Sequence, residues 1–368
     1  MQCAEPCNSL MREGHVLEGQ GKYKAAFEKY KAAETADPTA SLPVSLAAGL
    51  VFKLSSAAPA DEATRMRDTA RAMAERAVAL AADDPVAQEV LRMLDDDAPS
   101  PLHIPNAEAA RLTAEGSELF MQRKPKEALA KYEAAMKADP RHSPAWVGAA
   151  DCYYVQNDWP RAEALFRQAT EIEPRNAQAW RFLSDTLLAQ GQRSGAEAAL
   201  YASIAADPSQ RPSWSKLARL RAAAGLPLKT LAFKRGVRVV QGKDGSYAIN
   251  VDQASADTAN TPNYAFRMAL AFSEIKLRGE ARTRTTFEIE LEAWRLALKI
   301  IAETKANGGQ EVSDPALLEM AALARDGQLE PALLLLMFRP SYRPALESWL
   351  AANPGGVKLF IDRYGIQP

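Results

Sequence analysis

Residues that could do chemistry are few and scattered in this sequence. The histidines are His15, His103 and His142, and their spacing fits no zinc-binding motif. Three consecutive aspartates stand at positions 95–97 in a proline-rich stretch, where nothing would enclose a general acid–base pair. We therefore expect no catalytic residue, no metal site and no cofactor, and the protein is interpreted as a non-enzyme.

The chemical state of the cysteines near the N-terminus is open to three interpretations. Cys3 and Cys7 belong to a free terminus, to a disulfide formed in an oxidising compartment, or to half of an intermolecular site. We prefer the free terminus, because chain ends are poorly ordered unless they are tied down. Cys152 lies inside a helical pattern with no general base nearby in the sequence, so it is expected to be a small buried residue and not a nucleophile.

Two glycine-containing stretches are near misses for a phosphate-binding loop. The stretch 14–22 lies inside a helical pattern, and the stretch 236–243 has one residue too many between its glycines. Both lack the strand, loop and helix order that lets backbone N–H groups face a phosphate. A turn between helices and a hairpin turn account for them.

Charge and hydropathy narrow the classes of partner. The 368 residues carry 45 basic and 46 acidic side chains, a net charge of −1, so no large basic surface favours nucleic acid or an anionic membrane. The basic runs at 234–238 and 276–284 are expected to be solvated faces. No apolar run is long enough to span a bilayer, and the first residues lack the pattern of a signal peptide. A cytoplasmic location is the expectation; a periplasmic or secreted one becomes preferable if Cys3 and Cys7 are bridged.

The elements that organise the chain repeat with a fixed period. Acid–proline pairs end at prolines 140, 174 and 208, which are 34 residues apart. Positions of similar size recur between them. Bulky residues are Leu112, Trp146 and Trp180; small ones are Gly116, Ala150 and Ser184, then Ala128, Ala162 and Ala196; and large apolar ones are Tyr132, Phe166 and Leu200. This pattern predicts two antiparallel helices per unit, in which small residues accept large ones and proline ends the second helix.

These positions resemble the tetratricopeptide repeat, as in Trp146, Ala150, Tyr153, Trp159, Ala162, Phe166, Ala169 and Pro174. Another unit has the same register at the N-terminus, from Gly14 to Pro38. The resemblance implies a mostly α fold, an α-solenoid of helix pairs with a concave surface. The tryptophans at the repeat positions, Trp146, Trp180 and Trp214, are expected to pack in the core.

The same pattern divides the chain. We expect an N-terminal block at 8–94 with a degenerate second unit, a linker rich in proline and aspartate at 95–106, three units and a capping helix at 107–228, and a C-terminal module at 234–368 whose family is not recognised. In that module a β-hairpin is expected over 236–251. Helices are expected at 263–279, 285–306, 314–326, 329–338, 342–352 and 354–364.

The resemblance also implies which residues face a partner. First helices of such units line the groove, which here gives Thr113, Ser117, Phe120, Val147, Asp151, Tyr154, Arg181, Asp185, Leu188, Ser215 and Arg219. Some members of the family hold a peptide's C-terminal carboxylate with Lys and Asn at such positions. The matching places are Thr113, Ser117, Val147 and Asp151, so that mode of recognition is not expected.

Three functions are consistent with this sequence. The first is a non-catalytic scaffold that binds a peptide segment or helix of a protein partner in the concave groove, with no nucleic acid involved. The second is an enzyme or ligand-binding activity in the C-terminal module, tethered to the repeats. The third is a structural role in oligomerisation; the oligomeric state and the identity of the partner do not follow from the sequence.

Overall fold

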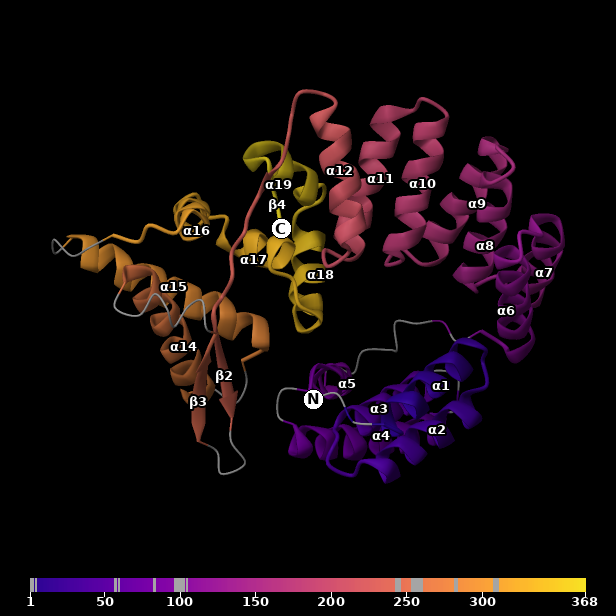
Figure 1. The fold of residues 1–368 in the computed structure, drawn as a ribbon, viewed down its shortest axis with the longest axis horizontal. Helices are drawn as coiled ribbons and strands as arrows, with labels where there is room; N and C mark the ends of the chain where they lie inside the picture. The colour runs from indigo at the N-terminus through magenta and orange to yellow at the C-terminus, as the bar shows by residue number, and fades with distance from the viewer. Residues whose placement is uncertain are drawn as a thin grey trace. The chain divides into compact units, whose positions relative to one another are not determined.

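The computed structural model describes residues 3, 5–55, 58, 60–81, 84–95, 103, 105–241, 246–252, 261–280, 284–306 and 311–368 (Figure 1). The chain divides into two compact units, residues 1–206 and 207–368. Within the described ranges, no helix combines the length and the apolar character needed to cross a membrane. Most of the linker expected at 95–106 lies outside the described residues.

The first unit is built of helices joined by short turns. They are α1 (Cys7–Gly19), α2 (Tyr23–Ala36), α3 (Leu42–Ser55), α4 (Ala60–Leu80), α5 (Pro85–Asp95), α6 (Ala107–Met121), α7 (Pro125–Ala138), α8 (Ser143–Tyr154), α9 (Trp159–Ile172), α10 (Ala177–Ala189) and α11 (Arg193–Ala206). Each pair expected from the period packs together: α1 with α2, α3 with α4, α6 with α7, α8 with α9 and α10 with α11. The mostly α fold of helix pairs is therefore confirmed. The degenerate second unit is the pair of α3 with the longer α4.

The repeated small residues are the places where large rings approach a neighbouring helix. The ring of Tyr132 on α7 lies against two first helices: a Cβ on Gly116 of α6 would stand 2.9 Å from it, and one on Gly148 of α8 only 2.4 Å. Ala128, Ala162 and Ala196 are each fully buried. A large side chain at any of these places would separate the helices, because interiors are packed to crystal-like density.

The recurring tryptophans connect the first helix of each repeat to the turn that precedes it. The indole Nε1 of Trp146 donates a hydrogen bond to the carbonyl of Pro140 at 2.9 Å, and the indole of Trp180 donates to Pro174 at 2.9 Å. Trp214 repeats this bond with Pro208, also at 2.9 Å. Trp214 is 2% exposed, whereas Trp146 and Trp180 are more exposed. The 34-residue period thus repeats a hydrogen bond as well as a packing pattern.

Ala162→Leu is expected to destabilise the first unit. Ala162 is completely buried in the core between α8 and α11, so three more carbons must displace packed side chains. The cost is about 1–3 kcal/mol. Urea unfolding followed by circular dichroism measures it, with the exposed neighbour Ala164→Leu as the control. Equal stability of Ala162→Leu and the parent would mean that the repeat register is misplaced.

The second unit begins with a helix that the sequence placed at the end of the repeats. It contains α12 (Arg211–Ala222), β1 (Lys229–Thr230), β2 (Val237–Gln241), β3 (Tyr247–Val251), α14 (Pro262–Glu280), α15 (Thr286–Ala306), α16 (Pro315–Arg325), α17 (Leu329–Leu336), a 3₁₀ turn η1 (Pro340–Tyr342), α18 (Arg343–Ala352), α19 (Gly356–Tyr364) and β4 (Ile366–Gln367). The expected hairpin is present: β2 and β3 pair antiparallel, with Val239 opposite Ile249, and α14 packs on β2. Its turn, 242–245, lies outside the described residues.

A short parallel pair of strands closes the second unit and was not expected. Lys229 pairs with Ile366 and Thr230 with Gln367, which brings the last residues of the chain beside the segment after α12. The Arg221 side chain of α12 reinforces this closure, because it forms an ion pair with Asp362 of α19 at 2.5 Å. The capping helix is therefore held by the C-terminal elements of its own unit.

The interior of the second unit contains a network of charges. The Arg235 guanidinium pairs with the carboxylates of Glu274 on α14 and Glu290 on α15, and all three side chains are no more than 12% exposed. Glu290 also accepts a hydrogen bond from the indole of Trp294 at 2.9 Å. The expectation that the basic run 234–238 is a solvated face is therefore wrong at Arg235. The two buried acids on α14 and α15 draw Arg235 inward, and they lie 39 and 55 residues after it in the sequence, too far for a local pattern to reveal them.

The terminal cysteines are paired. Cys3 and Cys7 form a disulfide, and both are buried, at 3% and 1% exposure, against Met11, Ala33 and Ala40. The preferred interpretation of a free terminus is therefore wrong. The two cysteines pack against Ala33 of α2 and Ala40 before α3, and this packing holds the N-terminal end of the chain in place. Cys152 is a free, fully buried thiol, as expected.

Candidate functional site

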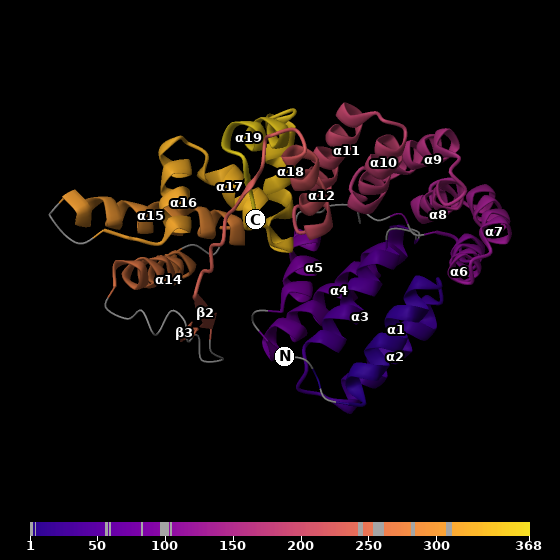
Figure 2. The ribbon, with the colours of Figure 1, turned by 45° about the horizontal axis from the view of Figure 1, so that its top comes forward.

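The predicted groove residues occupy one face of the first helices. On α6, α8 and α10 they stand at the same relative positions, four and then three residues apart, so each trio shares a helix face. Figure 2 shows α6 and α8 on the inner side of the row of helix pairs and α7 and α9 on its outer side. The predicted residues of α12 belong to the second unit and are exposed, at Ser215 and Arg219.

The α6 face is polar at one end and aromatic at the other. Ser117 is exposed and accepts a hydrogen bond from the Tyr132 hydroxyl at 3.1 Å, so this serine is anchored from the second helix. Thr113 is half-buried, and its hydroxyl has no hydrogen-bond partner among the described residues. Phe120 is half-buried beside the Tyr132 core. Of this trio, Ser117 and Phe120 offer surface to another molecule.

The α8 face holds the most unusual side chain of the groove. Val147 is only 9% exposed and packs in the core, so it offers little surface to a partner. Asp151 is half-buried, and among the described residues its carboxylate accepts no hydrogen bond and pairs with no cation. Tyr154 packs edge-on against Trp159 of α9, with ring centroids 4.9 Å apart. An acid and an aromatic pair thus share this face.

The α10 face mixes charge with an exposed apolar residue. The Arg181 guanidinium lies over the Phe182 ring at 5.2 Å, a cation–π contact. Leu188 is 39% exposed, which is high for a leucine in a repeat helix. Asp185, between them on this face, adds a second carboxylate whose charge acts on Asp151 and Tyr154.

The environment of Asp151 opposes its ionisation. Burial, and then the negative charge of Asp185 on the next first helix, raise the pKa of Asp151 to about 7. Burial, Asp185 and Asp151 also raise the pKa of the Tyr154 hydroxyl. A cation placed between the two carboxylates would reverse this effect, since an opposite charge favours the ionised form. This part of the first helices therefore places two carboxylates beside the half-buried Tyr154 and the exposed Leu188.

Asp151→Asn is expected to stabilise the protein in a pH-dependent manner. The pKa of Asp151 is raised in the folded state, so folding favours its protonated form, and its ionisation costs stability as the pH rises from about 4 to about 7. At pH 8 the variant should be more stable than the parent by about 2 kcal/mol, and near pH 4 the difference should vanish. Urea unfolding at both pH values measures this, with the exposed Glu133→Gln as control. A difference that is the same at both pH values contradicts the assignment.

The sequence did not reveal two features of this region. One is the bond from each repeat tryptophan to a proline carbonyl; the recurrence of Trp six residues after Pro was the available signal. The other is the pairing of Tyr154 with Trp159 across the turn from α8 to α9. Within the described ranges, no three His, Cys, Asp or Glu side chains lie together as metal ligands.

Comparison with known protein families finds a match in sequence. The sequence model described as "Tetratricopeptide repeat" matches residues 119–185 and 156–223. A search of curated proteins finds no match to this sequence.

Several solved structures are similar in fold at low identity. The first tetratricopeptide repeat domain of Spaghetti, bound to an HSP90 peptide, is 20% identical; the alignment covers 33% of this chain and 99% of that one, with a TM-score of 0.32. A tetratricopeptide repeat protein of Thermus thermophilus is 17% identical, with 59% and 99% covered and a TM-score of 0.29. PilW, a type IV pilus biogenesis factor, is 17% identical, with 61% and 88% covered and a TM-score of 0.31.

The matched residues begin on α6 and end after α12, where the 34-residue period, the buried small residues and the tryptophan–proline bonds were found. The chain is therefore a protein that contains tetratricopeptide repeats.

Proposed function

We propose that this chain is a non-catalytic protein-interaction scaffold whose repeats bind an extended or helical segment of a protein partner along α6, α8 and α10. The segment carries a basic side chain, which lies between Asp151 and Asp185, and apolar side chains, which contact Tyr154 and Leu188. Recognition of this kind joins a few apolar anchors to one or two charged contacts that fix the register.

The observation that carries this proposal is the state of Asp151. A half-buried carboxylate with a raised pKa and no partner cation in the described chain lowers the stability of the free protein. Destabilising residues are kept where function needs them, and perturbed titrating groups concentrate at such places. A bound ammonium or guanidinium group would supply the missing positive charge.

Asp151→Asn tests binding without weakening the fold. The variant removes the charge that would attract the basic group and is expected to be more stable than the parent above pH 7, so lost binding cannot be attributed to unfolding. Parent and variant chains, immobilised at equal density, are incubated with an extract of the cells that produce the protein, and captured proteins are quantified by mass spectrometry. We expect the specific partners to fall roughly tenfold on Asp151→Asn, the effect of one hydrogen-bonded charge.

Two further variants complete the design. Tyr154→Ala with Arg181→Ala removes the aromatic and cationic parts of the groove and should also abolish capture. Glu133→Gln with Lys137→Ala alters two exposed residues of the second helix α7 and should leave capture unchanged. If folded groove variants and the α7 control capture the same partners in the same amounts, the groove is not the binding surface.

We also propose that the protein resides in an oxidising compartment, the periplasm or the cell exterior, in preference to the cytoplasm. The proposal is supported by the pairing of Cys3 with Cys7, because disulfides persist mainly where thiols are not kept reduced. To test this, free thiols are alkylated in intact cells, and the mass of the purified protein shows how many cysteines reacted. Two alkylated thiols at Cys3 and Cys7 in the native cell would contradict it.

A further inference from the structure

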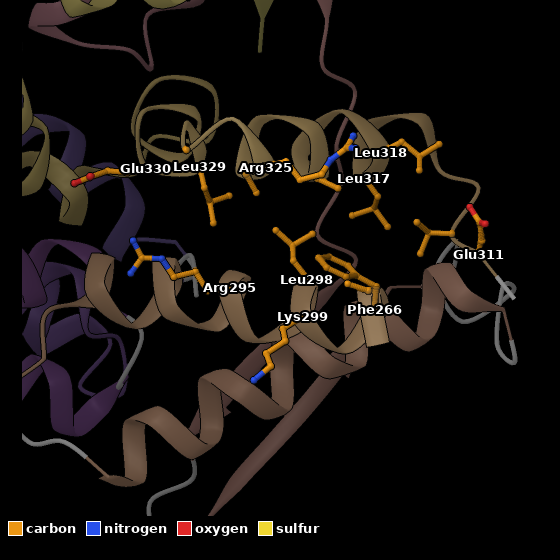
Figure 3. A pocket seen from close by; sticks show the side chains of 15 residues that line it. Phe266, Arg295, Leu298, Lys299, Glu311, Leu317, Leu318, Arg325, Leu329 and Glu330 are labelled. Atoms are coloured by element: carbon orange, nitrogen blue, oxygen red, sulfur yellow. The ribbon is translucent and has the colours of Figure 1, made fainter. Parts of the chain in front are cut away.

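The second unit contains a cavity that the proposed scaffold function does not use. Its volume is about 580 Å³, within the range of small-molecule sites. It lies between helices α15 and α16, with α14, the start of α17 and residues 311 and 312 completing the walls. Figure 3 shows Phe266 and Leu298 on one side facing Leu317 and Leu329 on the other.

The middle of the cavity is apolar. Phe266 and Leu317 are each 1% exposed, so they form the packed back of the cavity, and Leu298, which is half-buried, offers more of its surface. Leu318, at 46% exposed, stands at the rim. Small residues on the two long walls, Ala302 on α15 and Ala321 on α16, leave the space open. An apolar body fits such a space, and its transfer from water is favourable in proportion to the area it buries.

Charged side chains at the rim define the other end of the ligand. Arg295, Lys299 and Arg325 line the cavity together with Glu311 and Glu330. Arg295 lies 3.4 Å from Glu292, and Lys299 lies 3.9 Å from Glu303. In the part of the chain that the structure describes, Arg325 has no ion pair or side-chain hydrogen bond. Figure 3 shows Glu330 at one end of the cavity and Glu311 at the other, with Arg325 on the wall between them.

We propose that this cavity binds a small amphiphile with an unbranched or aromatic apolar body and a single carboxylate. The body lies between Leu298 and Leu317, and the carboxylate pairs with Arg325, whose planar fork of donors matches it. The two glutamates at the ends disfavour a ligand with acids at both ends. The site is independent of the repeat groove, so either proposal can fail without the other.

Calorimetric titration of the full chain with straight-chain carboxylates tests the size of the site. Butanoate, hexanoate, octanoate and decanoate are used as probes, each below its micelle concentration. We expect saturable binding with one site per chain, roughly fourfold tighter for each added methylene until the cavity is filled. Absence of binding by every acid in the series would overturn the proposal.

Variants separate the apolar body from the charged head. Ala302→Trp fills the cavity from an exposed position and should weaken decanoate at least about tenfold without affecting folding. Arg325→Gln should weaken decanoate roughly tenfold and leave the neutral decanol unchanged. Lys276→Gln, an exposed cation of α14 outside the cavity, is the matched control and should change neither.

Two outcomes would contradict the assignment of this site. If Ala302→Trp binds decanoate as tightly as the parent does, the ligand binds elsewhere. If Arg325→Gln lowers the affinities for decanol and decanoate equally, Arg325 does not bind the carboxylate. Light scattering runs beside the titrations. If the parent is a dimer that Ala302→Trp converts to a monomer, a second copy covers the cavity and the ligand proposal is wrong.

Discussion

Arg235→Met is expected to destabilise the second unit by about 3–5 kcal/mol at pH 7.5, the cost of breaking a buried ion pair from one side. Burial opposes ionisation of Glu290, but the Arg235 guanidinium outweighs it and holds the pKa of Glu290 below its usual value. Without that cation, the buried Glu290 carboxylate keeps the hydrogen bond from Trp294 but loses its ion pair, whereas Glu274 still pairs with Arg278 at 2.6 Å. Ionisation of Glu290 then opposes folding.

The sign of the pH dependence distinguishes this cause from lost packing. In the variant, Glu290 loses the strongest of the influences that lower its pKa, so burial favours its protonated form and acidification neutralises the unpaired carboxylate. The loss relative to the parent should therefore be largest at pH 7.5 and smaller at pH 4.5. Urea unfolding at both values measures it.

Two companion variants make the test specific. Arg235→Met with Glu290→Gln should recover part of the loss at pH 7.5, since the buried carboxylate that lost its ion pair is replaced by a neutral amide. Arg295→Met breaks an exposed pair with Glu292 and should cost less than about 1 kcal/mol. If Arg235→Met unfolds with the parent at pH 7.5, the network contributes nothing to the fold.

Trp180→Ala is expected to destabilise the first unit by about 3–5 kcal/mol. The side chain packs at the edge of the core formed by α8 to α11, and its indole satisfies the carbonyl of Pro174 at the end of α9. Its loss leaves a cavity between two repeats and an unpaired carbonyl in the turn. Thermal and urea unfolding of the full chain, followed by circular dichroism, measure the change.

Trp180→Phe separates the two contributions. Phenylalanine keeps most of the apolar contact and loses only the hydrogen bond, so it should cost roughly 1 kcal/mol. The same order, Ala worse than Phe, is expected at Trp146, which makes the same bond with Pro140. Equal stability of Trp180→Ala and the parent would show that the residue does not hold successive repeats together.

The helix pairs were predictable because their cause is local and repeated. A ring such as Tyr132 needs a residue without a side chain opposite it, and the sequence records this as Gly116 and Gly148 at fixed distances. One acid–proline pair would carry little information, but three at a constant period fix the length of every helix and turn between them. The hairpin 237–251 was predictable for a similar reason, from alternating β-branched residues around a glycine turn.

Contacts between residues far apart in sequence were not predictable. The β1–β4 pair joins two short strands, Lys229–Thr230 and Ile366–Gln367, which have no pattern of their own. Arg235 belongs to a basic run that looks exposed, and only the folded chain brings Glu274 and Glu290 to it. The cavity beside Leu298 is likewise an absence of atoms between helices, for which a sequence has no signal.

The helix faces that carry the predicted groove residues could be predicted, but the exposure and the ionisation of the individual residues could be predicted only in part. The trios on α6, α8 and α10 follow from the repeat register, but Val147 is buried and the raised pKa of Asp151 depends in part on Asp185 of the next repeat. Whether a given groove position is exposed depends on the neighbouring first helix. Register alone does not contain that information.

Site-specific photo-crosslinking tests the central claim, that the inner face of the repeats is where a partner binds. The photoreactive residue benzoylphenylalanine is placed at Leu188, which is 39% exposed in the groove, and in a second protein at Lys137 on the outer helix α7. Both proteins are irradiated in the cells that produce them, and crosslinked species are identified by mass spectrometry. We predict a discrete crosslink to a protein partner from position 188, lost in Asp151→Asn, and none from position 137. Crosslinks from position 137 alone, or the same partners from both positions, would contradict the account.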